Sequence, residues 1–193
     1  MVAAFGSTFG GKAAAFDADY AENLPYASIA VTLKNVPKAL LVLAKAEGDD
    51  LHWMSSDRSL LVTRKGRLIR TAGLTQNILQ TSIVNEDLIA GGVLPTKLQS
   101  AKQRKIVDLS PGNRYGMVVE SHYSVEKRQV LRILRYEHDT THITEHCHVP
   151  MLSWHFENQF WIDDQGTVWR SIQHITPEMP SVEIELIKAF RPT

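Results

Sequence analysis

Short runs of alternating apolar and polar residues dominate the chain from Tyr26 onward, and turn residues separate them. The first runs read ASIAVTL, KALLVLAKA, LHWMS, SLLVTR and RLIRTAG, and connections rich in Gly, Asp, Asn and Pro join them. Apolar–polar alternation over such short lengths is typical of half-buried β-strands joined by tight turns. The pattern therefore predicts an antiparallel meander of about five strands in the first part of the chain.

The middle of the chain, residues 74–105, follows a different pattern. Its apolar residues are spaced more like the face of a helix than like alternate positions of a strand. Gly91-Gly92 and Pro95 interrupt that spacing. We therefore expect one or two short helices in this segment. The residues that carry the pattern are Leu74, Ile78, Leu79, Ile83 and Leu88.

Strand-like runs resume after residues 110–113, which read SPGN. They are RYGMVVESHYSV, KRQVLRILRYEH, THITEHCHV, HFENQFWID, TVWRSIQHI and SVEIELIKAF. With the first part of the chain this makes about eleven strands, which is more than one flat open sheet holds comfortably. The expected fold is mainly β: an antiparallel β-sandwich or barrel-like fold of about eleven strands, with one or two short helices in the middle.

Composition narrows the class of protein. Residues 1–22 are rich in small residues and read as an N-terminal tether or tag, so residues 23–193 are expected to form a single domain. The 21 Lys and Arg balance 21 Asp and Glu, which argues against a nucleic-acid binder that relies on an overall positive field. Cys147 is the sole cysteine, so the chain has neither an internal disulfide nor a thiolate metal cluster.

Two segments of the chain are similar in sequence and align with one gap: WMSSDRSLLVTRKGRLIRT and WHFENQFWIDDQGTVWRS. Regular alternation along a strand places Arg70 on the face of Leu68 and Arg170 on the face of Val168. An arginine on an apolar face has to be paired or has to reach the rim. We therefore predict structural roles for Arg70 and Arg170 and comparable surroundings for the two Gly-turn hairpins. The matched positions are Trp53 with Trp154, Gly66 with Gly166, and Arg70 with Arg170.

Lys65 and Arg67 flank Gly66 at the first of these turns, where plain solvation is the simplest account. Arg67 and Arg70 are three residues apart, so a regular strand directs them to opposite faces of the sheet. We predict that Arg70 is largely buried, and that Lys65 and Arg67 are exposed and belong at most to a rim that binds a glycan or a partner. Trp53 is a further candidate for stacking on a sugar ring, with core packing as the alternative.

The stretch THITEHCHV holds the most suggestive polar cluster. In an extended strand His142, His146 and His148 point to one face, while Glu145 and Cys147 point to the other. Histidines at alternate strand positions can converge on one metal ion, and His142 or His155 could supply a third nitrogen. A solvent-facing strand gives the same string, so both interpretations stay open. Cys147 is predicted to be a small core residue rather than a nucleophile.

Signatures of catalysis are missing from the sequence. It holds no GxSxG motif, no phosphate-binding glycine loop and no dinucleotide fingerprint. The acidic pairs at 49–50, 86–87 and 163–164 fall in turn-like or helix-end contexts, where Asp is favoured for local hydrogen bonding. These observations predict a protein without enzymatic activity and without a cofactor.

Five segments, in order from about Asn23 to Pro192, carry a family resemblance: LPYASIAVTL, LLVLAKAEGDDLHWMSSD, GRLIRTAGL, ENQFWIDDQGTVWRSIQHITP and EIELIKAFRP. In these segments the chain resembles the YjbF/GfcB family of group 4 capsule and exopolysaccharide lipoproteins. The resemblance implies a mainly β protein that is lipid-anchored at the periplasmic face of the outer membrane and encoded with polysaccharide secretion machinery. It brings no established catalytic residue. A lipidated cysteine is not in this chain, because Cys147 is far from the N-terminus.

The leading hypothesis is thus a non-enzymatic periplasmic lipoprotein domain that supports capsule or exopolysaccharide secretion. It would do so by binding a protein of the secretion apparatus or the glycan itself, with no nucleic acid involved and with the membrane reached only through the lipid anchor. One alternative is a metal-assisted enzyme that acts on polysaccharide through His142, His146 and His148. Another is a structural adaptor whose exposed strand edges pair with an outer-membrane protein.

Overall fold

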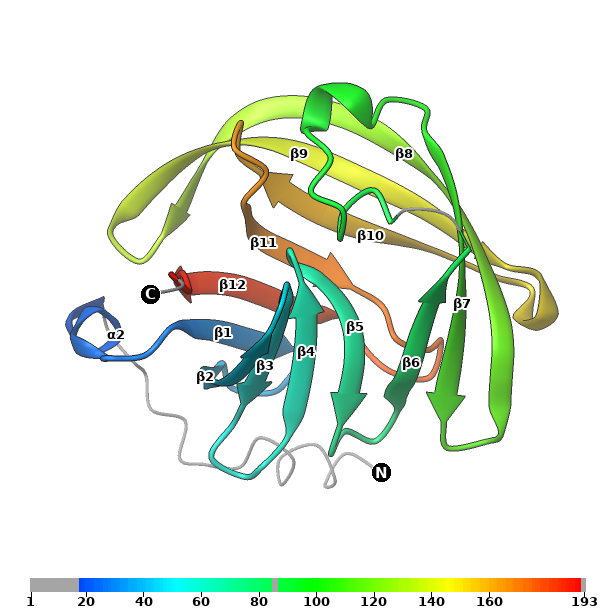
Figure 1. The fold of residues 1–193 in the computed structure, drawn as a ribbon, viewed down its shortest axis with the longest axis horizontal. Coiled ribbons are helices and arrows are strands. Elements are labelled where there is room, and N and C mark those ends of the chain that lie inside the picture. The colour runs from blue at the N-terminus through cyan, green and yellow to red at the C-terminus, as the bar shows by residue number, and fades with distance from the viewer. Residues whose placement is uncertain (1–17, 85–86, 192–193) are drawn as a thin grey trace.

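Twelve antiparallel strands form one sheet that curls into a nearly closed barrel (Figure 1) within residues 18–84 and 87–191, the part of the chain that the computed structural model describes. This confirms the mainly β, barrel-like fold expected from the sequence. The strands are β1 (Ser28–Leu33), β2 (Ala39–Glu47), β3 (Asp50–Met54), β4 (Leu60–Arg64), β5 (Arg67–Ala72), β6 (Asn77–Ile83), β7 (Lys102–Ser110), β8 (Arg114–Ile133), β9 (Tyr136–Val149), β10 (Trp154–Ile162), β11 (Val168–Gln173) and β12 (Val182–Lys188). The short helices are α2 (Ala18–Asn23) and the 3-10 helices η1 (Pro95–Lys97) and η2 (Pro150–Leu152).

The order of strands explains how the barrel closes. It runs β5-β4-β3-β2-β1-β12-β11-β10-β9-β8-β7-β6, so the first and last strands are neighbours in the middle of the sheet. The two edges, β5 and β6, then meet. Side chains bridge this seam: the amide of Ile78 donates to Thr71 Oγ1 at 3.0 Å, and Thr81 Oγ1 donates to the carbonyl of Ile69 at 2.9 Å. The seam is therefore joined through threonines as well as by packing.

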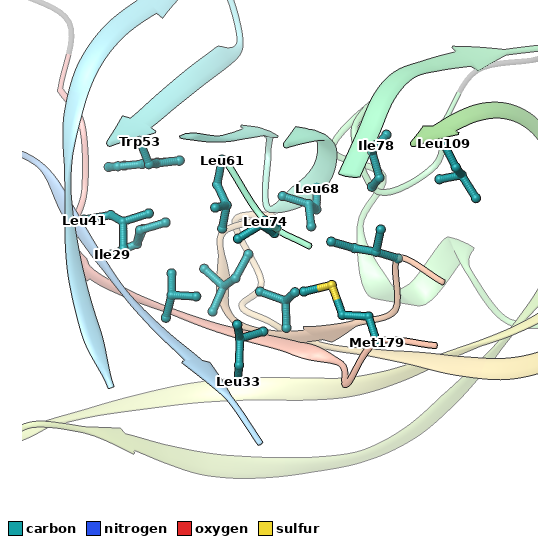
Figure 2. Packing of buried hydrophobic residues seen from close by; sticks show 14 residues of the cluster. Ile29, Leu33, Leu41, Trp53, Leu61, Leu68, Leu74, Ile78, Leu109 and Met179 are labelled. Carbon is teal, nitrogen blue, oxygen red and sulfur yellow. The ribbon is translucent and has the colours of Figure 1, made fainter. Parts of the chain in front are cut away.

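Alternate positions of the strands fill the interior with apolar side chains. The largest cluster gathers residues from both ends of the sheet order (Figure 2). Trp53 is 1% exposed within it, and its indole N–H donates to Thr63 Oγ1 at 2.8 Å. The prediction that Trp53 could stack on a glycan is therefore wrong. The labelled members in Figure 2 are Ile29, Leu33, Leu41, Trp53, Leu61, Leu68, Leu74, Ile78, Leu109 and Met179.

The middle segment differs in part from the sequence-based expectation. Residues 77–83, which have helix-like apolar spacing, form the edge strand β6. A short helix does follow, but it is the 3-10 helix η1. Ile89 and Leu98 from the connection around it pack on the inner face of β8–β10. In so short a run, the spacing of apolar residues does not distinguish a helix from a strand. Pairing with β7 therefore decides the structure of this segment.

The two Gly-turn hairpins are similar in backbone geometry as well as in sequence. Gly66 and Gly166 both have φ of 86°. In β5 the pairing register shifts at Ile69, and in β11 it shifts at Trp169, so each strand has a one-residue bulge three positions after its turn glycine. A bulge adds a residue to one strand only, so the side chains beyond it exchange faces. The predicted likeness of the two hairpins holds for the turn and for the strand geometry.

These bulges decide where the two arginines point. Leu68 and Thr71 are both buried, and Arg70 between them lies exposed on the outer face. The prediction of a buried, structural Arg70 is wrong, because strict alternation does not hold across a bulge. Arg170 also lies on the outer face, where its guanidinium pairs with Glu183 at 2.6 Å and sits 4.9 Å from the ring centroid of Trp161. Of the two, only Arg170 has the partners expected of a structural arginine on an apolar face.

The Lys65-Gly66 turn projects against the opposite wall of the barrel. A Cβ at Gly66 would lie 2.4 Å from Val168 Cβ, so a side chain has no room there. The Gln173 amide holds the same hairpin by donating to the carbonyl of Gly66 at 2.9 Å and accepting from the amide of Leu68 at 3.0 Å. Backbone groups of the edge strand β5 are thereby satisfied without another strand.

We predict that Gly66→Ala destabilises the protein far more than Gly48→Ala does. Both glycines have positive φ, which costs any other residue about 1 kcal/mol, but nothing lies within 4 Å of a Cβ at Gly48. At Gly66 the clash with Val168 adds about 1–3 kcal/mol of overpacking. Urea unfolding of the two variants checks this, and equal losses of stability would show that the turn is not packed against β11.

Candidate functional site

Arg67 lies at the centre of a buried ion cluster inside the barrel. Its side chain is in contact with two carboxylates: Nη1 is 2.6 Å from Glu145 Oε2, and Nε is 3.3 Å from Asp87 Oδ2. Its guanidinium also lies 4.9 Å from the ring centroid of Phe160. Arg67 is 1% exposed, so the prediction that it is an exposed rim residue is wrong. The turn before it lies against the far wall, and this buries both Arg67 and the next residue, Leu68.

Glu145 is the acceptor that ties the cluster together. Besides Arg67, it accepts hydrogen bonds from Lys105 Nζ at 3.0 Å and from Asn158 Nδ2 at 2.8 Å. Ser121 and Tyr123 hydroxyls each donate to it at 3.1 Å. These donors come from β5, β7, β8 and β10, so one carboxylate on β9 joins five strands.

The two basic side chains of the cluster, Arg67 and Lys105, match its two carboxylates in number, and they keep both carboxylates ionised. Burial alone would raise the pKa of Glu145, but Arg67 and Lys105 outweigh burial and hold that pKa well below its usual range. Asp87 also has a lowered pKa, because Arg67 and Lys105 outweigh its burial. Two cations and two carboxylates therefore remain ionised together. The adjoining cavity, of about 40 Å³, has room for little more than a water molecule, so the cluster is built as a brace rather than as a substrate site.

Cys147 faces the same interior from β9. It is buried, and burial raises the pKa of its thiol well above the usual range, with the nearby Glu145 carboxylate adding to the effect. Such a thiol is not a nucleophile at neutral pH. Its place among Met117, Val119 and Val149 is that of a small core residue.

The three histidines proposed as metal ligands do not come together. The ring of His142 stacks on Trp161 at 4.6 Å, whereas His148 stacks on His155 at 4.2 Å. Both ring nitrogens of His146 have partners, Glu157 and a serine, each at 3.0 Å. Among the described residues there is no group of three or more His, Cys, Asp or Glu placed to hold a metal ion. The alternation along the strand was correctly inferred, but His142 and His146 are four residues apart, which is two repeats of the strand.

A groove on the outer surface is the strongest candidate for ligand binding. It arises because β8 has a bulge between Val125 and Arg128, after which Leu131 and Ile133 pack on the outside of the sheet with Trp161. Figure 1 shows the long β8–β9 hairpin reaching toward α2 and the end of β12. Arg135 at the hairpin turn pairs with Asp19 in α2.

The groove has a volume of about 820 Å³ between this hairpin, the segment after α2, and the residues after β12. Its lining is aromatic and cationic. His138 stacks on Trp169 at 3.6 Å between ring centroids, and the indole N–H of Trp169 donates to Asp163 Oδ2 at 2.9 Å. Burial lowers the pKa of His138, so its ring is neutral at neutral pH and stacks as an uncharged surface. The lining residues on which the argument depends are Tyr26, Tyr136, His138, Trp169, Lys188 and Phe190.

Little in the sequence predicts this groove. Trp169 contacts the outer apolar cluster, and it also lines the groove. Tyr26 and Phe190 are 60% and 38% exposed, and they stand at opposite ends of the chain. Their meeting follows from the pairing of β1 with β12, which no local pattern encodes. Lys65 is exposed, as expected, but lies 3.4 Å from Asp49 and outside the groove.

Comparison with known proteins identifies the family to which the chain belongs. The family model described as "Group 4 capsule polysaccharide lipoprotein gfcB, YjbF" matches residues 4–187. The chain belongs to this family. It is 26% identical over 191 residues to the uncharacterized lipoprotein YjbF of Escherichia coli (strain K12), covering 96% of this chain and 86% of that protein. It is 25% identical over 173 residues to the uncharacterized lipoprotein GfcB of the same organism, covering 86% and 77%.

A solved structure shares the fold. The crystal structure of the hypothetical lipoprotein YmcC from Escherichia coli (K12) superposes with a TM-score of 0.81 at 22% identity, covering 100% of this chain and 97% of that one. YmcC thus has the same curled-sheet fold as this chain. Within the described residues, none of the helices has the length and apolar character needed to cross a membrane.

We expect Arg67→Ala to lower the free energy of unfolding by about 3–5 kcal/mol, because it leaves the two buried carboxylates, Glu145 and Asp87, with Lys105 as the one remaining cation of the cluster. Arg70→Ala, three residues away on the outer face, should change it by no more than about 0.5 kcal/mol. Chemical denaturation of the two variants in parallel gives both numbers. A destabilised Arg70 variant beside a stable Arg67 variant would reverse our assignment.

Proposed function

We propose that this protein is a lipid-anchored, non-enzymatic component at the periplasmic face of the outer membrane, and that it supports capsule or exopolysaccharide secretion by binding the polysaccharide in the aromatic groove. Membership in a capsule polysaccharide lipoprotein family supports the process. The observation that carries the binding step is the groove itself, which is lined by Tyr26, Trp169 and Phe190.

The groove has the size and chemistry of a glycan site. Its volume of about 820 Å³ lies within the range of known ligand pockets, roughly 300–1,000 Å³. Aromatic rings offer large flat surfaces that stack on the apolar faces of sugar rings, while their polar tips reach hydroxyl groups. Lys188 at the rim adds a donor, although its ammonium is already shared with the carbonyl of Leu24 at 2.5 Å. An open groove of this kind holds a segment of a long chain without needing its ends.

Binding fits the groove better than cleavage does. Glycoside hydrolysis ordinarily uses two carboxyl groups that face each other across the sugar. Of the described residues that line the groove, none is Asp or Glu. Two carboxylates that contact the groove walls already have partners: Asp163 accepts a hydrogen bond from Trp169, and Asp19 pairs with Arg135 of the β8–β9 hairpin. The groove therefore supports retention of a polysaccharide rather than its hydrolysis.

We predict that a Tyr26→Ala/Phe190→Ala double variant, as the sole copy in its native strain, reduces the amount of surface polysaccharide by about tenfold. Each exchange removes an exposed ring worth about 1 kcal/mol of stacking or more, while the barrel interior is untouched. Tyr115→Ala is the matched control, since Tyr115 is 59% exposed but lies at the start of β8, outside the groove. Quantification and gel sizing of the surface polysaccharide provide the readout.

Two outcomes bear on the occupant of the groove. If the purified double variant has lost affinity for the purified polysaccharide along with secretion, the groove binds the glycan. If secretion falls while glycan binding is unchanged, the groove binds a protein of the secretion apparatus and the glycan assignment is wrong. Normal secretion by the double variant, expressed at the parental level, would remove the groove from the function altogether.

A further inference from the structure

The outer face of β7–β10 carries a second, separate array of polar side chains. Strand pairing places its members in two adjacent rows that cross four strands. Because alternate residues of a strand share a face, both rows face the same side of the sheet. One row is Lys102, His122, His146 and Glu157, and the next is Arg104, Glu120, His148 and His155. We call these eight residues the histidine face.

The histidine face holds four of the eight histidines of the chain. Their rings are stacked across strands in two pairs, His122 on His146 at 4.8 Å with 20° between planes, and His148 on His155 at 4.2 Å with 11° between planes. A hollow of about 500 Å³ lies over them. His146 is the most constrained, since its ring nitrogens contact Glu157 and Ser124. A sheet face needs no such concentration of imidazoles for its own stability.

The charge of the histidine face depends on the protonation of its imidazoles. With neutral rings, Lys102 and Arg104 on β7 balance Glu120 on β8 and Glu157 on β10. Each imidazole that takes up a proton adds one positive charge to this face, and the four rings together can add four. Two stacked imidazolium rings repel each other, and an anion placed over both removes that repulsion. Proton uptake and anion binding are therefore coupled on this face.

We propose that the histidine face binds carboxylate-bearing polysaccharide when its imidazoles are protonated. The choice of a polysaccharide rests on the proposed function, whereas the site itself is distinct from the aromatic groove. Charge complementarity selects the ligand, because the protonated face presents six cations against two carboxylates. The spread of these cations over two rows and four strands suits a repeating polyanion better than a single small anion.

The test uses polygalacturonate as a carboxylate-bearing polysaccharide and dextran as a neutral one, with EDTA present throughout. Isothermal titration calorimetry is run near pH 5.5 and near pH 7.5, one unit below and above the pKa of about 6.5 of a free imidazole. We expect polygalacturonate to bind at least about tenfold more tightly in the acidic buffer, with net proton uptake revealed by buffers of different ionisation enthalpy. Dextran should show no such pH dependence.

A His148→Gln/His155→Gln double variant should lose the tenfold gain at acidic pH while keeping its melting temperature, because both residues are on the outer face. His52→Gln is the matched control: His52 lies on β3, near Glu47 and away from the histidine face, and its loss should leave the gain intact. The Tyr26→Ala/Phe190→Ala variant should also retain it, which separates this site from the groove.

The outcomes that overturn the proposal are distinct. Equal affinity for polygalacturonate at both pH values, or no binding at either, removes acid-dependent recognition of carboxylates. Loss of the acid gain in the His52 variant as much as in the His148/His155 variant assigns it to overall charge. Loss in the groove variant alone moves the site to the groove, and binding that appears only when EDTA is replaced by zinc shows that the histidines act through a metal.

Discussion

The contact between Arg67 and Glu145 is the constraint on which the rest of the fold depends. The sheet has two edges, β5 and β6, and it curls so that the start of β5 meets the inner wall formed by β8–β10. Only there can a cation at the first position of β5 reach the buried carboxylate of β9. A buried ion pair contributes little net stability over an apolar replacement, but an unpaired member is very unfavourable. The pair therefore penalises any other register or any opening of the barrel.

A filled interior moves ligand binding to the outside. The apolar clusters and the ion cluster occupy the inside of the barrel, and Ile89 and Leu98 from the connection before β7 pack there too. Bulges then turn apolar and aromatic residues outward: the bulge in β8 places Leu131 and Ile133 over Trp161, and the bulge in β11 exposes Trp169 to the groove. The β7–β10 part of the same sheet presents the histidine face instead. One rigid scaffold thus supports two outer surfaces of different chemistry.

Much of the fold could be predicted from the sequence, because strand length, alternation and turn residues are local signals. The Gly-turn hairpins and the inward direction of Cys147 and Glu145 followed from such signals. The position of Arg70 did not, since one extra residue at Ile69 reverses every later side chain and alternation alone does not reveal a bulge. The burial of Arg67 did not follow either, because it depends on the packing of the preceding turn against β11 on the far wall. The second hairpin has an equivalent bulge at Trp169, so the two similar segments share this feature. Neither segment's sequence identifies the bulge on its own.

The candidate site was less predictable, for a related reason. The groove joins Tyr26, the β8–β9 turn and Phe190, which are brought together by the pairing of the first strand with the last. The histidines were correctly assigned to one strand face, but their partners His122 and His155 come from neighbouring strands whose register is set by further bulges and turns. Sequence reasoning therefore named His146, His148 and His155 but not His122, and considered a metal site where the structure shows stacked rings.

A double-mutant cycle between Arg67 and Glu145 tests the central claim most directly. Arg67→Met and Glu145→Gln each remove one charge while keeping most of the side-chain volume, and urea unfolding gives the stability of the parent, both single variants and the double variant. Our account predicts that each single variant loses about 3–5 kcal/mol and that the double variant is less destabilised than their sum by about 2 kcal/mol or more. Losses that add to within about 0.5 kcal/mol would show that the two residues are not coupled, and that another interaction closes the barrel.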